Sequence, residues 1–580
     1  MTTLTLGTLF TADSENLRSS RSLDAHEIAH QWFGDLVTCK DWSHLWLNEG
    51  FAVFYQLLYD RHKMGEDFFK MGLYRNAQGI LSRNEDKIPI VNKQFANPME
   101  QFSFRAYPKG GWVLQMLRHR VGEENFRRAI KIYLERHQFG TVVTADLLKV
   151  MEEVSGRSLD QFFDQWVYLA GHPDLDVRYH WDGGARQVRL NIRQTQKVSE
   201  KRPLFRFPLT VRFKNGESVE DIEIEVSEKE EDFYFSRIEE PGTIRLDPEM
   251  AVLARIKFGL PDPLLEAQLK DPADAMGRFL GVKQLAKRKD AKAMTWLEEA
   301  LQQDAFGPVR EEAARILAAR QSPEALRVLI DSREQSDGRV RREVVRGLGA
   351  YFHGDAFQAL RAVAGTEKNP DIRREAIRSL GKYSQPGLRA ELLGYLKESS
   401  YRHEIASAAI QALKAQGDSR AVLPLLTHLE RKEAAFPTRR FSSALRQVVS
   451  LAGNEDAKVR ERILQFLSER IYHPKKEVRK AVIDCIGRLK SDRGVAILES
   501  LKGDSEIKDV VASALRAARQ NGEAPVPEQV SKLQHQITGL EGQVDELQKS
   551  YSALKKRLEE RLKFENGKPR EGSGKEKKKD

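Results

Sequence analysis

The stretch His26-Glu27-Ile28-Ala29-His30, followed eighteen residues later by Glu49, decides how this chain is interpreted. Two histidines four residues apart on a helix project from the same face and can share one metal ion. Two neutral imidazoles and one carboxylate suit Zn²⁺, and three protein ligands leave its fourth position open. Glu27 follows the first histidine directly and can lie beside that open position. The pattern predicts a zinc hydrolase with one Zn²⁺ per chain.

The residues around this stretch decide whether the five-residue pattern is a coincidence, since such a pattern alone does occur by chance in helices. The stretch continues as Gln31-Trp32-Phe33-Gly34-Asp35, and Glu49 lies within Trp46-Leu47-Asn48-Glu49-Gly50-Phe51-Ala52. An apolar run from Phe51 to Leu58 predicts a helix with Glu49 near its start. This context favours the metal site over the coincidence.

These segments resemble the gluzincin aminopeptidases, the family of membrane alanyl aminopeptidase and leukotriene-epoxide hydrolase. The spacing, the Trp-Phe-Gly-Asp tail and the Asn-Glu-Gly-Phe-Ala segment all match. The resemblance implies a thermolysin-like catalytic domain in which His26, His30 and Glu49 bind zinc. It also implies that Glu27 is the general base.

A second segment, Tyr107-Pro108-Lys109-Gly110, resembles the family's Tyr-x-Lys-Gly motif. A tyrosine before Lys-Gly is often an ordinary loop residue, but its distance from the zinc motif favours a catalytic role. The resemblance implies that Tyr107 stabilises the oxyanion. The chemistry is consistent, because zinc polarises a carbonyl and acidifies water. Glu27 would transfer the proton, and Tyr107 would donate a hydrogen bond to the developing charge.

One motif of the family is missing from the sequence. The Gly-x-Met-Glu-Asn segment, whose glutamate binds the substrate α-amine in the family, does not occur, and neither does the N-terminal β domain. The opening residues 1–7 resemble the segment that follows this motif. We therefore expect an N-terminally truncated catalytic domain, with aminopeptidase activity that depends on the upstream part.

Composition indicates a protein of several domains. The 580 residues are 40% hydrophobic and 31% charged, without an apolar run long enough for a transmembrane helix and without a signal peptide, so the chain as given is expected to be cytoplasmic. The two cysteines, Cys39 and Cys485, lie in different predicted domains, which argues against a disulfide framework. Cys39 is predicted to be a partly buried thiol outside the ligand set. The net charge of +10 is spread over the chain, so no nucleic-acid partner is expected.

The predicted organisation is multidomain and mainly α. Residues 1–172 read as the helical catalytic domain. Residues 173–258 read as a small antiparallel β-sandwich, since apolar Val188, Leu190 and Ile192 alternate with polar residues and Asn215-Gly216 is a hairpin turn.

Residues 259–521 contain an internal repeat. Four segments align at spacings of 31, 32 and 33 residues, and fainter copies begin near Gly277, Phe441, Val478 and Ile507; the four are Val309–Leu317, Val340–Leu348, Ile372–Leu380 and Ile405–Leu413. Each begins with an apolar residue, often followed by arginine. The period resembles HEAT-type repeats, which form an α-solenoid that binds a protein partner. The alternative, a generic helical domain, does not explain the near-constant register.

Residues 528–564 carry a heptad with mostly β-branched residues at position a and leucine at position d, from Val530 to Leu558. This favours a parallel two-stranded coiled coil and a homodimer. A helix that docks elsewhere in the same chain is the alternative. The tail, residues 565–580, is rich in glycine and lysine and is expected to be disordered.

The sequence therefore predicts a zinc metallopeptidase, specifically an aminopeptidase acting on peptide substrates. The alternative is a non-catalytic scaffold that binds proteins through the repeats, as in a subunit of the eukaryotic promoter-recognition complex. The five intact site residues argue against the scaffold, and the missing amine-binding motif argues for it. An epoxide hydrolase has no positive support in the sequence.

Overall fold

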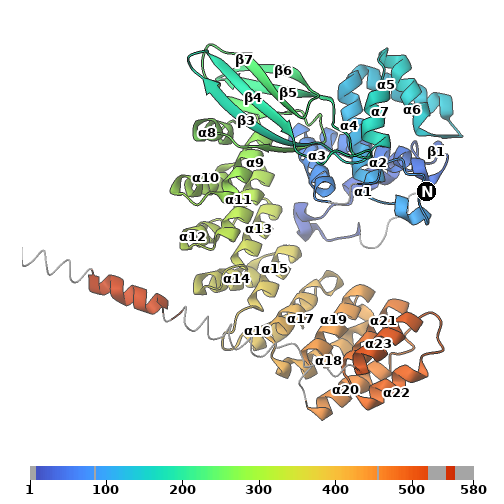
Figure 1. Cartoon of the computed structure of the whole chain (residues 1–580). Helices are drawn as coiled ribbons and strands as arrows, with labels where there is room; N and C mark the ends of the chain where they lie inside the picture. The colour runs from blue at the N-terminus through green and yellow to red at the C-terminus, as the bar shows by residue number, and fades with distance from the viewer. Residues whose placement is uncertain (1–7, 84–86, 453–455, 520–541, 543, 556–580) are drawn as a thin grey trace, which may run out of the picture. The chain divides into compact units, whose positions relative to one another are not determined.

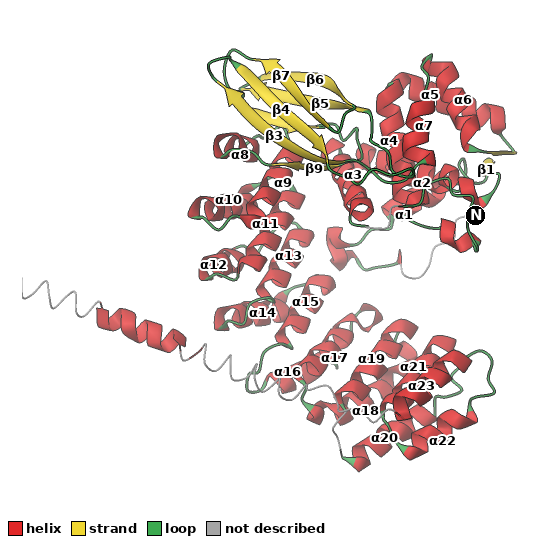
Figure 2. Ribbon diagram, viewed as in Figure 1, coloured by secondary structure: helices red, strands yellow, loops and turns green. Residues whose placement is uncertain are grey.

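The computed structural model describes residues 8–83, 87–452, 456–519, 542 and 544–555. The chain is mainly helical with small sheets, as the sequence predicts (Figures 1 and 2). Its contacts divide it into two compact units. The first unit is Met1–Phe10 with Asn16–Ile316, and the second is Thr11–Glu15 with Leu317–Asp580.

The helical part that begins the first unit contains the metal-binding motif. Two short strands, β1 (Val37–Cys39) and β2 (Gly140–Val142), pair in parallel beside the helices. The helices are α1 (Arg21–Ala29), α2 (Trp46–Met64), α3 (Glu66–Leu81), α4 (Gly110–Val121), α5 (Glu123–His137), α6 (Thr144–Ser155) and α7 (Asp160–Phe163), followed by a π-helical turn at Asp164–Tyr168.

Helix α2 is the central element of this part. The apolar run predicted to be helical lies within it, and Phe51, Phe54 and Leu57 recur at a helical spacing with at most 4% of each exposed. Full burial of each such side chain contributes about 1.5–3 kcal/mol. The helix ends at Gly65, whose φ of +91° suits glycine. This packing fixes the first turn of α2, which carries Glu49.

The alternating segment after the helical part forms seven strands in two sheets, ordered β7-β4-β3-β9 and β6-β5-β8. Val188, Leu190 and Ile192 are buried on one face of β4, as their alternation predicts. One pairing differs from the antiparallel expectation: β9 pairs with β3 in parallel. The strands are β3 (Asp174–Asp182), β4 (Gln187–Gln194), β5 (Phe207–Asn215), β6 (Ser218–Val226), β7 (Glu230–Ser236), β8 (Thr243–Leu246) and β9 (Arg255–Phe258).

Helical hairpins follow from residue 262 to residue 519. The four clear repeat segments lie within second helices, and the fainter copies also begin in second helices, except the last, which begins at Ile507, one residue before its helix. The first helices are α8 (Asp262–Leu269), α10 (Ala291–Gln303), α12 (Pro323–Asp331), α14 (Gly354–Thr366), α16 (Leu388–Tyr395), α18 (Val422–Lys432), α20 (Ala457–Ser468) and α22 (Asp492–Ser500). The second helices are α9 (Ala275–Gln284), α11 (Gly307–Arg320), α13 (Gly338–Leu348), α15 (Pro370–Leu380), α17 (Glu404–Gln416), α19 (Thr438–Leu451), α21 (Lys476–Arg488) and α23 (Lys508–Arg519).

The arginine at the start of several second helices joins successive hairpins. Arg341 donates through Nη1 to the carbonyl of Gln335 in its own hairpin, at 2.8 Å, and through Nε to Glu367 of the next hairpin, at 3.1 Å. Arg373 likewise contacts the carbonyl of Ala364, and its Nη1 lies 2.7 Å from Glu398. The recurring arginine of the sequence therefore links two successive hairpins, and we call this contact an arginine tie.

The predicted coiled coil, residues 528–564, lies outside the described residues except for 542 and 544–555, which are helical, and the tail 565–580 lies wholly outside them. In the helical portion Val544, Leu547, Tyr551 and Leu554 are each 50–71% exposed. None of the helices in the described part of the chain has the length and hydrophobicity that a bilayer-spanning segment requires.

Candidate metal centre

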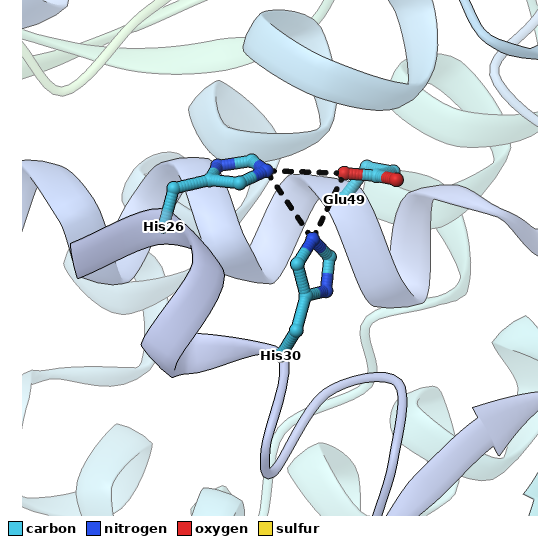
Figure 3. A group of neighbouring side chains, drawn as sticks. All are labelled: His26, His30 and Glu49. Carbon is cyan, nitrogen blue, oxygen red and sulfur yellow. Dashed lines mark hydrogen bonds and ion pairs between the residues drawn. The ribbon is translucent and has the colours of Figure 1, made fainter. Parts of the chain in front are cut away.

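Helices α1 and α2 bring the predicted ligands together (Figure 3). His26 lies in the last turn of α1, and His30 follows at its end. Their Nε2 atoms are 3.2 Å apart, and each lies 3.3 Å from Oε2 of Glu49. Among the residues that the structure describes, this is the single group of three potential ligands close enough to hold a metal ion.

The distances within this group test whether Zn²⁺ fits. Ligand bonds of about 2.0–2.1 Å in a tetrahedron place neighbouring ligand atoms about 3.3–3.4 Å apart. The three observed separations, 3.2, 3.3 and 3.3 Å, are within about 0.2 Å of that edge length. His26 and Glu49 are each 9% exposed, so the protein shields two of the ligands from water. The donor set and its spacing fit a zinc ion.

The ring of His30 is oriented by the backbone that follows it. Its Nδ1 lies 2.9 Å from the carbonyl of Phe33, and a hydrogen bond donated there leaves Nε2 free to face the other two side chains. Gly34 makes this approach possible. Its φ is +149°, and a Cβ at this position would lie 3.3 Å from Nδ1 of His30. The Trp-Phe-Gly-Asp tail is thus part of the site's geometry.

The Glu49 carboxylate is held ionised. Burial raises its pKa, but hydrogen bonds from His26, His30 and Tyr107 lower the pKa by more than burial raises it. The net effect lowers the pKa to about 2. The same hydrogen bond to Glu49 raises the pKa of His30 above its ordinary value, with burial opposing the change. The group therefore has the negative charge that a divalent cation requires.

Tyr107 lies in a π-helical turn, Arg105–Lys109, that leads into α4. Its ring is parallel to the His26 ring, with centroids 6.2 Å apart. Burial, followed by the nearby charge of Glu49, raises the pKa of its phenol well above the usual range. The phenol therefore keeps its proton at neutral pH and can donate a hydrogen bond over the metal-binding group.

Two glycines set the distance between Tyr107 and Glu49. Gly50 of α2 and Gly110 of α4 cross backbone to backbone, and a Cβ on Gly50 would lie 2.9 Å from the carbonyl carbon of Gly110. A Cβ on Gly110 would lie 3.1 Å from Cα of Gly50. Each glycine is adjacent or close in sequence to a candidate site residue, so the contact ties the two segments together.

Lys109 anchors the other side of the π-helical turn. Its side chain is fully buried, and its Nζ donates a hydrogen bond of 3.0 Å to the carbonyl of Gly171, just before β3. Asn48 has a similar role for Glu49, since its side-chain oxygen accepts from the backbone N–H of Cys39, at 3.1 Å. The sequence motifs include both residues but do not reveal these partners.

Glu27 is half-buried on α1, between the two histidines in sequence. Its charge contributes to raising the pKa of both His30 and Tyr107, so it lies near both. Cys39 is partly buried, as expected, and lies outside the metal-binding group. Burial raises the pKa of its thiol to about 11, so it stays protonated.

Comparison with known families agrees with this geometry. Residues 2–166 match the peptidase family M1 domain, and residues 261–349, 332–414 and 357–446 match HEAT repeats. The chain therefore carries a segment that matches a peptidase family M1 domain, followed by HEAT repeats, which confirms the resemblance inferred from the motifs.

The chain is similar to several curated proteins over part of its length. It is 37% identical over 175 residues to the tricorn protease-interacting factor F2 of Thermoplasma volcanium, covering 29% of this chain and 22% of that protein. It is 30% identical over 266 residues to the puromycin-sensitive aminopeptidase of Caenorhabditis elegans, covering 43% and 27%. It is 34% identical over 172 residues to human glutamyl aminopeptidase, covering 28% and 18%. The chain thus spans less than a third of the length of these relatives.

A solved structure shares the fold. The aminopeptidase A of Legionella pneumophila, determined in complex with aspartic acid, superposes with a TM-score of 0.54 at 15% identity. The match covers 85% of this chain and 65% of the other. At this identity the likeness concerns the fold alone.

Proposed function

We propose that this chain is a zinc-dependent aminopeptidase in which His26, His30 and Glu49 hold one Zn²⁺. The observation that carries the proposal is the triangle of two Nε2 atoms and one Oε2 atom with sides of 3.2–3.3 Å, inside a domain that matches peptidase family M1. Bound zinc supplies a Lewis acid that polarises a carbonyl and makes water easier to deprotonate.

The residues around the triangle then have distinct tasks. Glu27 takes a proton from the attacking water and delivers it to the leaving amine, since it lies on α1 beside the two histidines. Tyr107 donates its phenol proton as a hydrogen bond to the carbonyl oxygen while negative charge develops there. Its raised pKa keeps that donor protonated.

The substrates we propose are peptides with a free N-terminus, by similarity to relatives named as aminopeptidases. The HEAT repeats add a surface for a protein partner. The heptad segment, residues 528–564, would add a homodimer contact. A non-catalytic scaffold would have no need to preserve five site residues with mutually compatible positions, so the enzyme is favoured.

Metal content tests the ligand assignment. Wild-type protein, purified without chelator, should contain about one zinc per chain by elemental analysis. His30→Ala should remove that zinc, because two ligands rarely retain it. His62→Ala is the matched control, since His62 is an exposed histidine of α2 outside the metal-binding group, and it should keep full occupancy. Full occupancy in His30→Ala would refute the assignment.

Substrate choice tests the aminopeptidase assignment separately. An aminoacyl anilide and its N-acetylated form differ only in the free amine. Hydrolysis of the first but not the second indicates an aminopeptidase. Hydrolysis of both would indicate a zinc peptidase of another kind, and hydrolysis of neither by zinc-loaded protein would favour the scaffold.

A further inference from the structure

A cavity of the first unit that none of the metal-binding residues lines carries a strong positive charge. Its volume is about 680 Å³, and it lies where the chain passes from the helical part into β3. The segment 170–174 forms one wall, the loop between β4 and β5 forms another, and the start of β9 completes it. The charged lining is six basic side chains and two acidic ones; the basic ones are Arg83, Lys87, Lys197, Lys201, Arg202 and Arg255.

One of the two acids is already neutralised. Asp174 lies 3.4 Å from Arg202, 3.4 Å from Arg255 and 3.3 Å from the ring of His172. Burial raises the pKa of Asp174, but His172 and the two arginines lower it more, so its pKa falls below the ordinary value. The other acid, Glu200, is exposed. The described lining residues therefore have a formal excess of four positive charges.

The three lysines of the cavity have no counter-ion in the part of the chain that the structure describes. Among the residues that the structure describes, Lys87, Lys197 and Lys201 are exposed and make no ion pair with a carboxylate. Three unpaired ammonium groups around one cavity repel each other, and a bound anion would relieve that repulsion.

Arg202 gives the cavity a fixed guanidinium. Its Nη2 donates to the carbonyl of His172, at 3.2 Å, and contacts Asp174. Its stem lies over Gly171, where a Cβ would come within 2.7 Å of Cγ and Nε, so a glycine with φ of +90° is required there. The Nε atom is buried and has no hydrogen-bond partner among the described residues. Arg202 is therefore held in place before any ligand arrives.

We propose that this cavity binds a multivalent anion of the phosphate class. A fixed arginine with lysines around it matches the charge of phosphate, and the lysine ammonium groups are donors for its several acceptor oxygens. A singly charged carboxylate would leave most of the excess charge uncompensated. Inorganic phosphate and the phosphate group of a larger molecule share this chemistry, and the cavity volume has room for either.

Equilibrium dialysis against inorganic phosphate and, separately, glycerol 3-phosphate tests the proposal. The measurement uses the full chain at low ionic strength, because salt screens exposed charges. The double variant Lys197→Gln with Lys201→Gln should weaken binding at least about tenfold, equivalent to about 1.4 kcal/mol. Lys229→Gln is the matched control, since Lys229 is exposed on the same β part but does not line the cavity. It should bind as wild type does.

The outcomes separate the ligands and the alternatives. If both probes bind saturably, the site accepts a phosphate group whether it is free or part of a larger molecule. If only inorganic phosphate binds, the site is specific for the free ion. Phosphate held by the zinc would be equal in all three proteins, so it does not imitate the expected difference. No saturable binding in wild type overturns the proposal. Wild-type affinity in the double variant also overturns it. So does a loss of binding free energy in Lys229→Gln that equals the loss per lysine in the double variant, since that would indicate diffuse charge attraction.

Discussion

Alanine at position 50 should damage the site without removing any reactive group. Gly50 follows Glu49 on α2 and crosses Gly110, which begins α4 three residues after Tyr107. The new Cβ would meet backbone atoms at 2.9, 3.0 and 3.2 Å. Backbone cannot rotate aside as a side chain can, so the two helices must move apart.

The size of the movement follows from these contacts. A carbon–carbon approach of about 3.4 Å is the start of ordinary contact, so the crossing must widen by about 0.5 Å. A misplacement of about 1 Å costs about 10²-fold in rate, so half of that costs about tenfold in kcat. Overpacking costs about 1–3 kcal/mol, and the helix propensity of alanine returns about 1 kcal/mol. The net loss of stability is therefore at most about 2 kcal/mol.

Gly79→Ala is the matched control. Gly79 is also a helical glycine of the first unit, on α3, but a Cβ there meets no atom within 4 Å. The same substitution should stabilise the protein there by about 0.5–1 kcal/mol. The assay is urea denaturation together with zinc content and kcat/KM for all three proteins.

The two substitutions should change the free energy of unfolding in opposite directions, and this difference is the test. Gly50→Ala should retain zinc, because Glu49 and the histidines remain, while both stability and turnover fall. If Gly50→Ala gained stability like Gly79→Ala and kept the wild-type kcat, the crossing would not set the position of Tyr107.

Three further predictions concern other parts of the chain. Glu27→Gln should keep zinc and lose hydrolysis, whereas Tyr107→Phe should keep zinc and lose about 10²–10³ in kcat, and wild-type rates in both would contradict the assigned roles. Asp247 is buried, and burial raises its pKa to about 6, so the folded state binds a proton that the unfolded state has already released. The free energy of unfolding should therefore fall as the pH rises from about 4 to about 6. Asp247→Asn should remove this fall from a series of urea denaturations over pH. If the fall persisted in Asp247→Asn, Asp247 would not be its source. Arg341→Met should cost about 2–3 kcal/mol in urea denaturation, because Glu367 and Glu15 both lose an ion-pair partner. A double-mutant cycle with Glu367→Gln measures the share of the Glu367 pair, and a coupling of zero would show that this pair does not stabilise the array.

The metal-binding group could be predicted from the sequence because helix geometry fixes it. His26 and His30 share a face at any i, i+4 spacing on α1, and Glu49 needs only the start of a second helix nearby. The repeats could be predicted for a related reason, because every hairpin of the stack has the same local sequence pattern. All eight predicted copies begin within a second helix or one residue before it. Both the metal-binding group and the repeats could therefore be predicted from local sequence periodicity.

Contacts between segments distant in sequence could not be predicted in this way. Lys109 and Gly171 are 62 residues apart, and no local period links them. The crossing of Gly50 and Gly110 left a visible signal, a glycine immediately beside each site motif, but its partner could not be identified without the structure. The parallel pairing of β9 with β3 likewise depends on which edge of the sheet is free, and alternation along one strand does not specify that.

The arginine ties between hairpins determine how this repeat array can change its length. Arg341 and Glu367 belong to consecutive hairpins, as do Arg373 and Glu398, so in this part of the array an arginine contacts an acid of the following hairpin twice in succession. If one whole hairpin were removed, the arginine before it would meet the acid of the hairpin after it, and an ion pair would form again. Removal of a single helix would leave one charge of each sign without its counterpart. Gene rearrangements that preserve the array should therefore occur in whole periods, and engineers who shorten or extend it should cut at equivalent points of two hairpins.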